Sequence, residues 1–268
     1  MRAIRTISLN VFKESVRDKV LYNLVFFAVL LIAVSYLLSQ LTAGQDVKII
    51  KDLGLFAMSV FGLFIAVFIG IGLVSKEVEK RSIYSLLTKP MRRHEFIVGK
   101  YLGLVLTLLV NIGIMTLAYY SVLGSIAWRE GSWFLPHWGA PALDPALLKA
   151  VGMICLQLMI ITAVALFFST FSSSMLAAAL TFGVYIVGHF NADLKNFEAV
   201  VDSRPLVYTA RMLYYLLPNF AALDIKNQVV HALPVPAPYL VLNTAYSAVY
   251  IAVLVTAATL IFMRRDFK

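Results

Sequence analysis

Charge is scarce in this chain and is almost missing from its long apolar stretches. Asp, Glu, Lys and Arg make up 14% of the 268 residues, whereas 61% of the residues are hydrophobic. Soluble domains carry about a quarter charged residues. The mean hydropathy of +0.85 agrees with this imbalance. The composition therefore excludes an ordinary soluble domain and indicates a polytopic membrane protein.

Cysteine and histidine are too few for the sites that they commonly build. The single cysteine, Cys155, excludes an intrachain disulfide. The four histidines are scattered, without the spacing of a metal site, and His189 near a span end is better explained as an interfacial histidine than as a metal ligand. A signal peptide is not evident, because residues 1–19 are too long and mixed for a basic leader and no small-residue cleavage site follows.

A phosphate-binding loop is missing as well. Gly99-Lys100 would need a glycine five residues before Gly99 and a Ser or Thr after the lysine, and those positions hold His94 and Tyr101. Gly99 instead pairs with Gly103 as two small residues four positions apart, which predicts a close helix contact at the start of the third span. We expect no catalysis, no metal and no cofactor in this chain.

The apolar runs also lack the carboxylate or base that ion-coupled pumps keep within the membrane. Their strongest polar side chains are Asn111, Gln157 and Asn243, for which helix–helix hydrogen bonds are favoured over contacts with a substrate. With neither an ion relay nor a nucleotide site, the chain needs an energy source from outside.

Six membrane spans are predicted from the uncharged windows, because about 20 apolar residues cross the hydrocarbon core. The uncharged run 150–192 is too long for one helix, and its Ser/Thr cluster at 169–174 divides it into two. Pro234, Pro236 and Pro238 delay the last span. The predicted spans are about 20–41, 53–75, 101–127, 149–168, 173–190 and 239–263.

The basic residues predict which side each loop faces. The N-terminal segment, the 76–100 loop and the C-terminal tail hold 15 Lys/Arg and 6 acidic residues, whereas the other side holds 8 of each. Cytoplasmic loops carry the excess of Lys and Arg, so both termini and the 76–100 loop are predicted to be cytoplasmic, in a cytoplasmic (inner) membrane. The net charge of +9 is then a topology signal, with some attraction to lipid, and not a nucleic-acid footprint.

Residues 1–19 have the pattern of a basic amphipathic helix in the headgroup region. The apolar residues of this pattern are Ile4, Ile7, Val11, Phe12 and Val16, and of these Ile4, Ile7, Val11 and Val16 are expected to face acyl chains. The residues expected to face headgroups are Arg2, Arg5, Lys13 and Arg17. The alternative is a frayed cytoplasmic tail, against which the regular spacing argues.

The loop 76–100 is the one long, dense run of charge in the sequence. Its middle predicts a short amphipathic helix, because Ile83, Leu86 and Leu87 fall at i, i+3 and i+4. Pro90 ends this helix by biasing Lys89 out of the α region. We infer that the apolar face of this stub is offered to a cytoplasmic protein.

The run EKRSIYSLLTKPMRR at 79–93, followed by Gly99-Lys100, resembles the loop between spans two and three in permease subunits of ABC-2 type ATP-binding-cassette exporters. Arg81 stands where many members have glycine, and Arg92 where they have a Ser or Thr that would cap the next helix. The segment EKRSIYSLLTKP and the terminal RRDFK are similar to the branch that includes nitrous-oxide-reductase maturation permeases.

The resemblance implies an all-α permease domain over 1–268, with six spans, an interfacial N-terminal helix and a coupling helix between spans two and three. It implies that two such permeases, identical or paralogous, pack as a dimer with two cytoplasmic ABC ATPase subunits, which bind the ATP and Mg. The residues that it assigns to ATPase coupling are Glu79, Arg81, Ser82, Ile83, Leu86, Leu87, Pro90 and Arg93.

Two functions remain open at this point. In the first, the permease exports an amphipathic or lipid-linked substrate, driven by ATP hydrolysis on the partner. In the second, it transmits force from the ATPase to a periplasmic partner, such as a metal-site maturation protein, docked on the extracytoplasmic loop 191–238, and nothing crosses the membrane.

The predicted orientation can be tested by cysteine labelling in a Cys155→Ala background. Single cysteines at Lys80 and Arg92 should react with a membrane-impermeant reagent only from the cytoplasm, because the basic loops face inward. Cysteines at Asp46 and Lys226 should react from outside. The reverse pattern would contradict the predicted topology.

Overall fold

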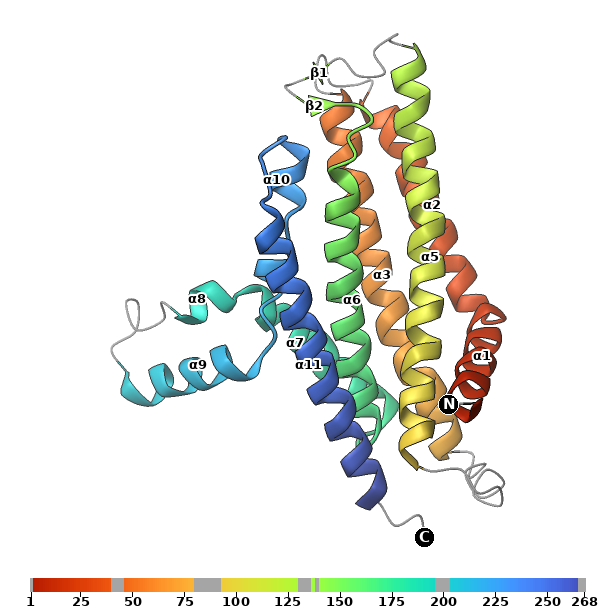
Figure 1. Cartoon of the computed structure of the whole chain (residues 1–268), viewed down its shortest axis with the longest axis vertical. Helices are drawn as coiled ribbons and strands as arrows, with labels where there is room; N and C mark the ends of the chain where they lie inside the picture. The colour runs from red at the N-terminus through yellow and green to blue at the C-terminus, as the bar shows by residue number, and fades with distance from the viewer. Residues whose placement is uncertain are drawn as a thin grey trace.

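The computed structural model describes residues 2–39, 46–79, 93–129, 136–137, 140–195 and 203–264. Its long helices run side by side in one bundle (Figure 1). We call the end where α3 ends, α5 begins and α11 ends the terminal end, and the opposite end the far end. The long helices are α2 (Lys19–Ser39), α3 (Asp46–Glu79), α5 (Arg93–Arg129), α6 (Leu147–Ser169) and α11 (Ala237–Arg264).

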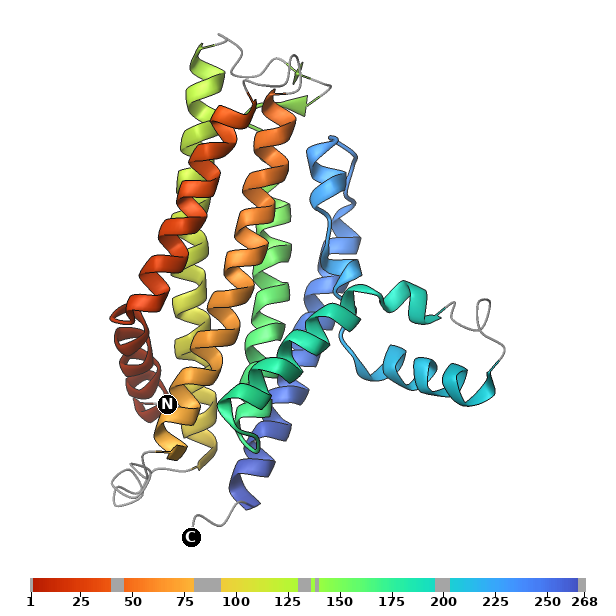
Figure 2. The same ribbon diagram turned by 180° about the vertical axis from the view of Figure 1, so that it is seen from behind.

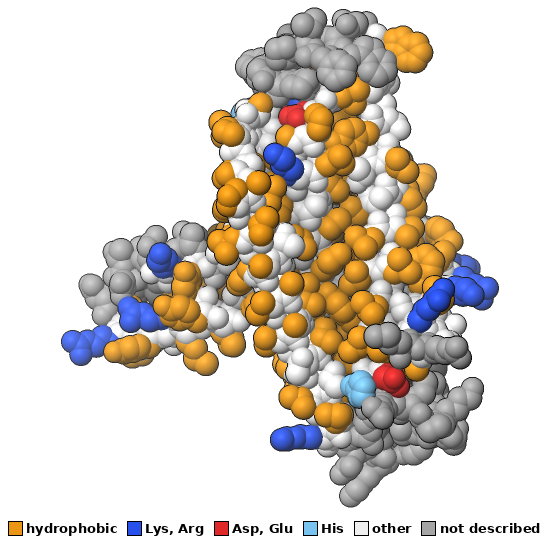
Figure 3. All heavy atoms as spheres, viewed as in Figure 1, with side chains coloured by type: hydrophobic (Ala, Val, Ile, Leu, Met, Phe, Trp, Pro, Cys, Tyr) orange, Lys and Arg blue, Asp and Glu red, His pale blue; other side chains and the backbone are white. Residues whose placement is uncertain are grey.

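Each of these five helices is long and apolar enough to cross a membrane. Hydrophobic side chains cover the side of the bundle seen in Figure 3. The chain is therefore a membrane-embedded helical protein, and the five helices coincide with five of the predicted spans. Apart from helices, the described residues include two antiparallel two-residue strands near the far end, β1 (Pro136–His137) and β2 (Ala140–Pro141).

The helices extend beyond the uncharged windows. At the far end α3 takes in Lys51 and Asp52, and the Lys51 side chain is only 1% exposed. At its start α11 takes in Pro238, which a helix tolerates in its first turn because no intrahelical N–H bond is needed there. Charged and proline residues therefore lie within the helix ends as well as between helices.

The predicted break in the long uncharged run is confirmed. α6 ends at Ser169, and α7 (Ser174–His189) begins five residues later. The hydroxyl groups of Ser169, Thr170 and Ser172 donate hydrogen bonds to carbonyl oxygens in the last turn of α6. Hydroxyl side chains thus take up the acceptors that a continuing helix would use.

The fifth predicted span, 173–190, is shorter than a full crossing. α7 has 16 residues, or about 24 Å at 1.5 Å per residue, against about 30 Å of hydrocarbon. It rises obliquely from the terminal end and stops part way along the bundle (Figure 2). The count of six spans therefore stays a prediction.

After α7 the chain leaves the bundle as two short helices, α8 (Asn191–Lys195) and α9 (Arg204–Leu216), which we call the arm (Figure 1). It returns through the 3-10 helix η2 (Ala221–Leu223) and α10 (Lys226–Val230), which lies toward the far end. α9 has Pro205 in its first turn and ends at Leu216, two residues before Pro218.

The N-terminal helix α1 (Arg2–Val16) packs along the first turns of α5 (Figure 2). A Cβ atom added at Gly99 would lie 2.9 Å from the Ile7 Cβ, and one added at Gly103 would lie 2.7 Å from the Ser8 carbonyl oxygen. The predicted close contact of the two glycines is therefore confirmed, and its partner is α1.

The apolar face of α1 consequently lies on protein. Val11 is buried together with Leu104 of α5, and Ile7 packs against this pair. The prediction that Ile7 and Val11 face acyl chains is wrong, because an apolar stripe looks the same whether lipid or a helix covers it. Arg5, Lys13 and Arg17 are exposed, the Arg2 side chain lies outside the description, and the interfacial position of α1 stays a prediction.

Gly103→Ala is expected to weaken the α1–α5 contact. The added methyl group would collide with the Ser8 carbonyl oxygen and Val11, and overpacking costs about 1–3 kcal/mol. Gly113→Ala is the matched control on the same helix, because no atom lies within 4 Å of its Cβ position, and it gains up to about 1 kcal/mol of helix propensity. Thermal unfolding in detergent micelles measures both. Equal melting temperatures would contradict this packing.

Candidate functional site

The predicted ATPase-coupling segment lies between the end of α3 and the start of α5. Residues 80–92 lie outside the described residues, and so do the side chains of Glu79 and Arg93, which end α3 and begin α5. The coupling helix and its residues therefore stay predictions. Those within 80–92 are Arg81, Ser82, Ile83, Leu86, Leu87 and Pro90.

The first turns of α5 are held on several sides. Ile97 is buried, and the Tyr101 hydroxyl donates a hydrogen bond to the Met159 carbonyl oxygen of α6 at 3.3 Å. The Phe96 ring stacks on Phe262 of α11, with 5.6 Å between centroids. α1 covers another side of the same turns. A displacement of the loop before Arg93 would therefore reach α1, α6 and α11.

Lys100, the last charge of the run 76–100, is buried within this packed helix. Its side chain is 1% exposed, and its ammonium group lies 4.7 Å from the centroid of the Phe96 ring. This is a cation–π distance, and such contacts are strongest where water is excluded. The sequence could not reveal this burial, because a charge at the end of an apolar run indicates a boundary as readily as a buried lysine.

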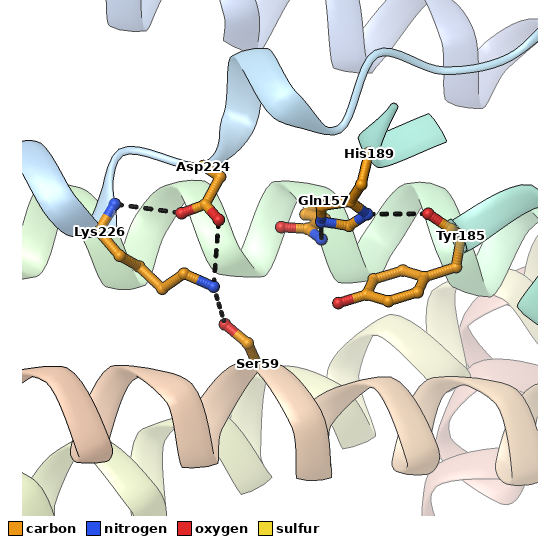
Figure 4. A network of polar contacts seen from close by, with 6 residues as sticks. All are labelled: Ser59, Gln157, Tyr185, His189, Asp224 and Lys226. Atoms are coloured by element: carbon orange, nitrogen blue, oxygen red, sulfur yellow. Dashed lines mark hydrogen bonds and ion pairs between the residues drawn. The ribbon is translucent and has the colours of Figure 1, made fainter. Parts of the chain in front are cut away.

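A second group of polar side chains joins the far half of α3 to the segment that precedes α10 (Figure 4). The Lys226 ammonium donates a hydrogen bond to Ser59 Oγ of α3 at 3.1 Å and lies 3.3 Å from Asp224 Oδ2. The Asp224 carboxylate also accepts the Lys226 backbone N–H at 3.2 Å. We call Ser59, Asp224 and Lys226 the latch.

The latch is half-buried: the side chains of Lys226 and Asp224 are 24% and 32% exposed. Its ion pair is therefore partly screened and contributes little on its own. Its consequence is positional, because it fixes the segment 224–226 against α3. This pairing could not be predicted from a local sequence pattern, because Ser59 and Lys226 are 167 positions apart.

Gln157 of α6 and His189 of α7 form the hydrogen bond between helices that was predicted for Gln157. His189 Nδ1 lies 2.8 Å from the Tyr185 carbonyl oxygen, which can only accept, so Nδ1 carries the proton. In neutral His189 the other nitrogen, Nε2, then accepts from Gln157 Nε2 at 3.2 Å. Asn111 and Asn243 differ from the prediction, because their amides donate to carbonyl oxygens of their own helices, at Thr107 and Tyr239.

Three tyrosines on one face of α11 bind the backbone of residues 216–222, from the end of α9 into η2. The hydroxyl groups of Tyr239 and Tyr250 donate to the carbonyl oxygens of Ala222 (2.6 Å) and Leu216 (2.8 Å). The Tyr246 hydroxyl accepts the Asn219 N–H at 3.0 Å. Irregular backbone needs such partners wherever water is excluded.

Among the residues that the structure describes, no group of three or more His, Cys, Asp or Glu is placed to hold a metal ion. The polar groups found here bind one another or the backbone. These bonds hold the helices and the segments between them against one another.

The sequence matches a family model described as "ABC-2 family transporter protein" over residues 5–267. The match takes in the whole bundle and the segment 80–92 that carries the resemblance to a coupling loop. The match does not confirm the more specific resemblance to the branch that includes nitrous-oxide-reductase maturation permeases. A comparison with curated proteins yields no match.

Replacing Gln157 is expected to loosen the α6–α7 junction. Gln157→Met keeps the side-chain length but leaves His189 Nε2 without its donor, and an unsatisfied buried polar group costs about 1–3 kcal/mol. Asn111→Leu is the control, because the Thr107 carbonyl oxygen that it releases lies within a helix. Thermal unfolding in detergent should show the larger loss for Gln157→Met. A larger loss for Asn111→Leu would contradict the role of the Gln157–His189 bond.

Proposed function

The chain belongs to the ABC-2 transporter family, and from this premise we propose that it is the permease of an exporter driven by an ATPase subunit docked on residues 80–92. The observation that carries the proposal is the continuity of the two helices that flank this segment. α3 has 34 residues and α5 has 37, without interruption. At 1.5 Å per residue they are about 51 Å and 56 Å long, more than the hydrocarbon core requires.

The packing of α3 supports transmission from the loop to the far end. α6 approaches α3 closely at Gly62, where an added Cβ would meet Leu158, and at Gly70, where it would lie 3.1 Å from the Ala165 Cβ. Near the far half, Ser59 of α3 binds Lys226. A force applied where α3 ends would therefore move α6 and the latch with it.

The arrangement of helix ends supports the proposed orientation. α3 ends, α5 begins and α11 ends at the same end of the bundle (Figure 1). These are the ends that adjoin the basic loop and the basic tail. We propose that this end is cytoplasmic, that two permease chains pair with two ATPase subunits, and that an amphipathic or lipid-linked substrate leaves between the two permeases.

Force transmission to a partner protein, without passage of a substrate, is the second candidate. The arm leaves the bundle in the half nearer the terminal end (Figure 1), and its helix α9 exposes large apolar and aromatic side chains (Figure 3). Patches of this kind commonly mark interaction surfaces. An ATPase gene alone beside this gene would favour export, and an added gene for a secreted binding protein would favour transmission. The exposed side chains are Leu206, Tyr208, Met212, Tyr215 and Leu216.

Leu86→Asp should separate the permease from its ATPase. Burying one leucine is worth roughly 1.5–3 kcal/mol, and the aspartate would bring an unpaired charge into the buried contact with the ATPase. We expect at least about a tenfold loss of affinity when the chain is co-purified with the ATPase encoded beside it. Ser85→Asp adds the same charge next to the apolar stripe and should keep most of the binding.

The two variants also separate the possible outcomes. If Leu86→Asp inserts normally in the membrane and retains full ATPase binding and turnover, the docking proposal is wrong. Equal losses in both variants would show that the added charge, and not the buried leucine, weakens the complex.

A further inference from the structure

Residues 14–19, where α1 ends and α2 begins, form an elbow beside a cavity. We propose that this cavity binds a phospholipid whose headgroup carries both a phosphate and a primary amine. The cavity has a volume of about 380 Å³ and is lined by the residues of the elbow on one side and by α3 on the other. This volume is within the range of small-molecule sites. The proposal concerns lipid bound to the permease and does not depend on the substrate or on the ATPase.

The elbow stands where the membrane-spanning part of α2 begins. The apolar span starts at Lys19, directly after Arg17 and Asp18. Asp18 Oδ1 accepts the Val20 N–H at 2.9 Å, so this carboxylate starts α2 and is fixed beside the cavity. Lys and Arg side chains gather beside α1 in Figure 3. The cavity therefore lies at the level where lipid headgroups meet the chain.

The α3 wall of the cavity is apolar and the elbow wall is charged, which matches the acyl chain and the headgroup of a lipid. The α3 wall offers the ring of Phe68, which is 50% exposed, and Gly72, with no atom within 4 Å of its Cβ position. This leaves room for the first part of an acyl chain against an apolar surface. A small polar ligand would gain little from this apolar wall.

The elbow wall carries both signs of charge. Arg17 and Lys19 line the cavity together with Glu14 and Asp18. A guanidinium group binds phosphate oxygens with two parallel hydrogen bonds, and carboxylates accept hydrogen bonds from an ammonium group. An anionic headgroup without an amine would face the two carboxylates, and a choline headgroup has no N–H to donate. Both signs together favour an ethanolamine headgroup.

A lipid in this cavity would tie the elbow to α3. The contact of α1 with α5 at Gly99 and Gly103 holds the other side of α1. The bound lipid would then hold α1 between two helices that flank the predicted coupling segment.

The test is native mass spectrometry of the purified full chain, released from nanodiscs that contain equal parts of phosphatidylethanolamine, phosphatidylcholine and phosphatidylglycerol. We expect the wild-type chain to retain phosphatidylethanolamine about tenfold over the other two, as loss of a charge-assisted hydrogen bond implies. Arg17→Gln and Glu14→Gln should each remove this preference. Lys13→Gln, an exposed change on the same helix outside the cavity, should keep it.

Three results would overturn the proposal. One is a preference of the wild-type chain for phosphatidylglycerol. Another is an equal loss of bound lipid in Lys13→Gln and Arg17→Gln, which would show general attraction between a basic helix and the membrane. The third is displacement of the lipid by soluble phosphoethanolamine at matching concentration, which would show that the headgroup alone is the ligand. The wild-type comparison needs no variant and holds even if one variant fails to fold.

Discussion

The packing of α3 is the constraint on which the rest of this structure depends. α3 contacts α2, α5, α6 and α7, and most of its membrane-spanning part is buried within the protein. Glycines on α3 let α6 approach so closely that neither helix can shift alone without creating gaps or clashes. Packed interfaces of this kind change between discrete arrangements and do not deform continuously. The end of α3 at the predicted coupling segment and its far half at the latch therefore belong to one mechanical unit.

Membrane depth adds a second constraint, because every backbone N–H and C=O group there needs a partner within the protein. The long helices meet it internally. The chain between α9 and α10 meets it only in part, and the hydroxyl groups of Tyr239, Tyr246 and Tyr250 on α11 add partners for its backbone. The close approach of Phe220 to Gly188 adds another backbone bond, from the Phe220 N–H to the Gly188 carbonyl oxygen at 3.0 Å.

Most of the helices could be predicted from the sequence, because uncharged runs of this length fit few structures other than membrane spans. The Ser/Thr cluster at 169–174 was equally informative, since hydroxyl side chains end a helix by local bonds. The sequence did not show which side chains are covered by other parts of the protein. The stripe of Ile7 and Val11 does not say whether lipid or α5 lies against it, and the charge of Lys100 does not say that it is buried. The latch depends on a contact between distant parts of the chain, which no local pattern records, and the coupling residues at 80–92 lie outside the described part.

The transmission of movement along α3 is tested most directly by the distance between two spin labels near the far end, one at Gln228 on α10 and one at Ser125 on α5, both exposed positions. α3 and α5 flank residues 80–92, so the proposed docking of an ATPase on these residues would change the angle between the two helices. In the complex with its ATPase, trapping the nucleotide-bound state should shift this distance, measured by double electron–electron resonance, and Leu86→Asp should abolish the shift. An unchanged distance while the bound ATPase turns over, or a shift that survives Leu86→Asp, would contradict the account.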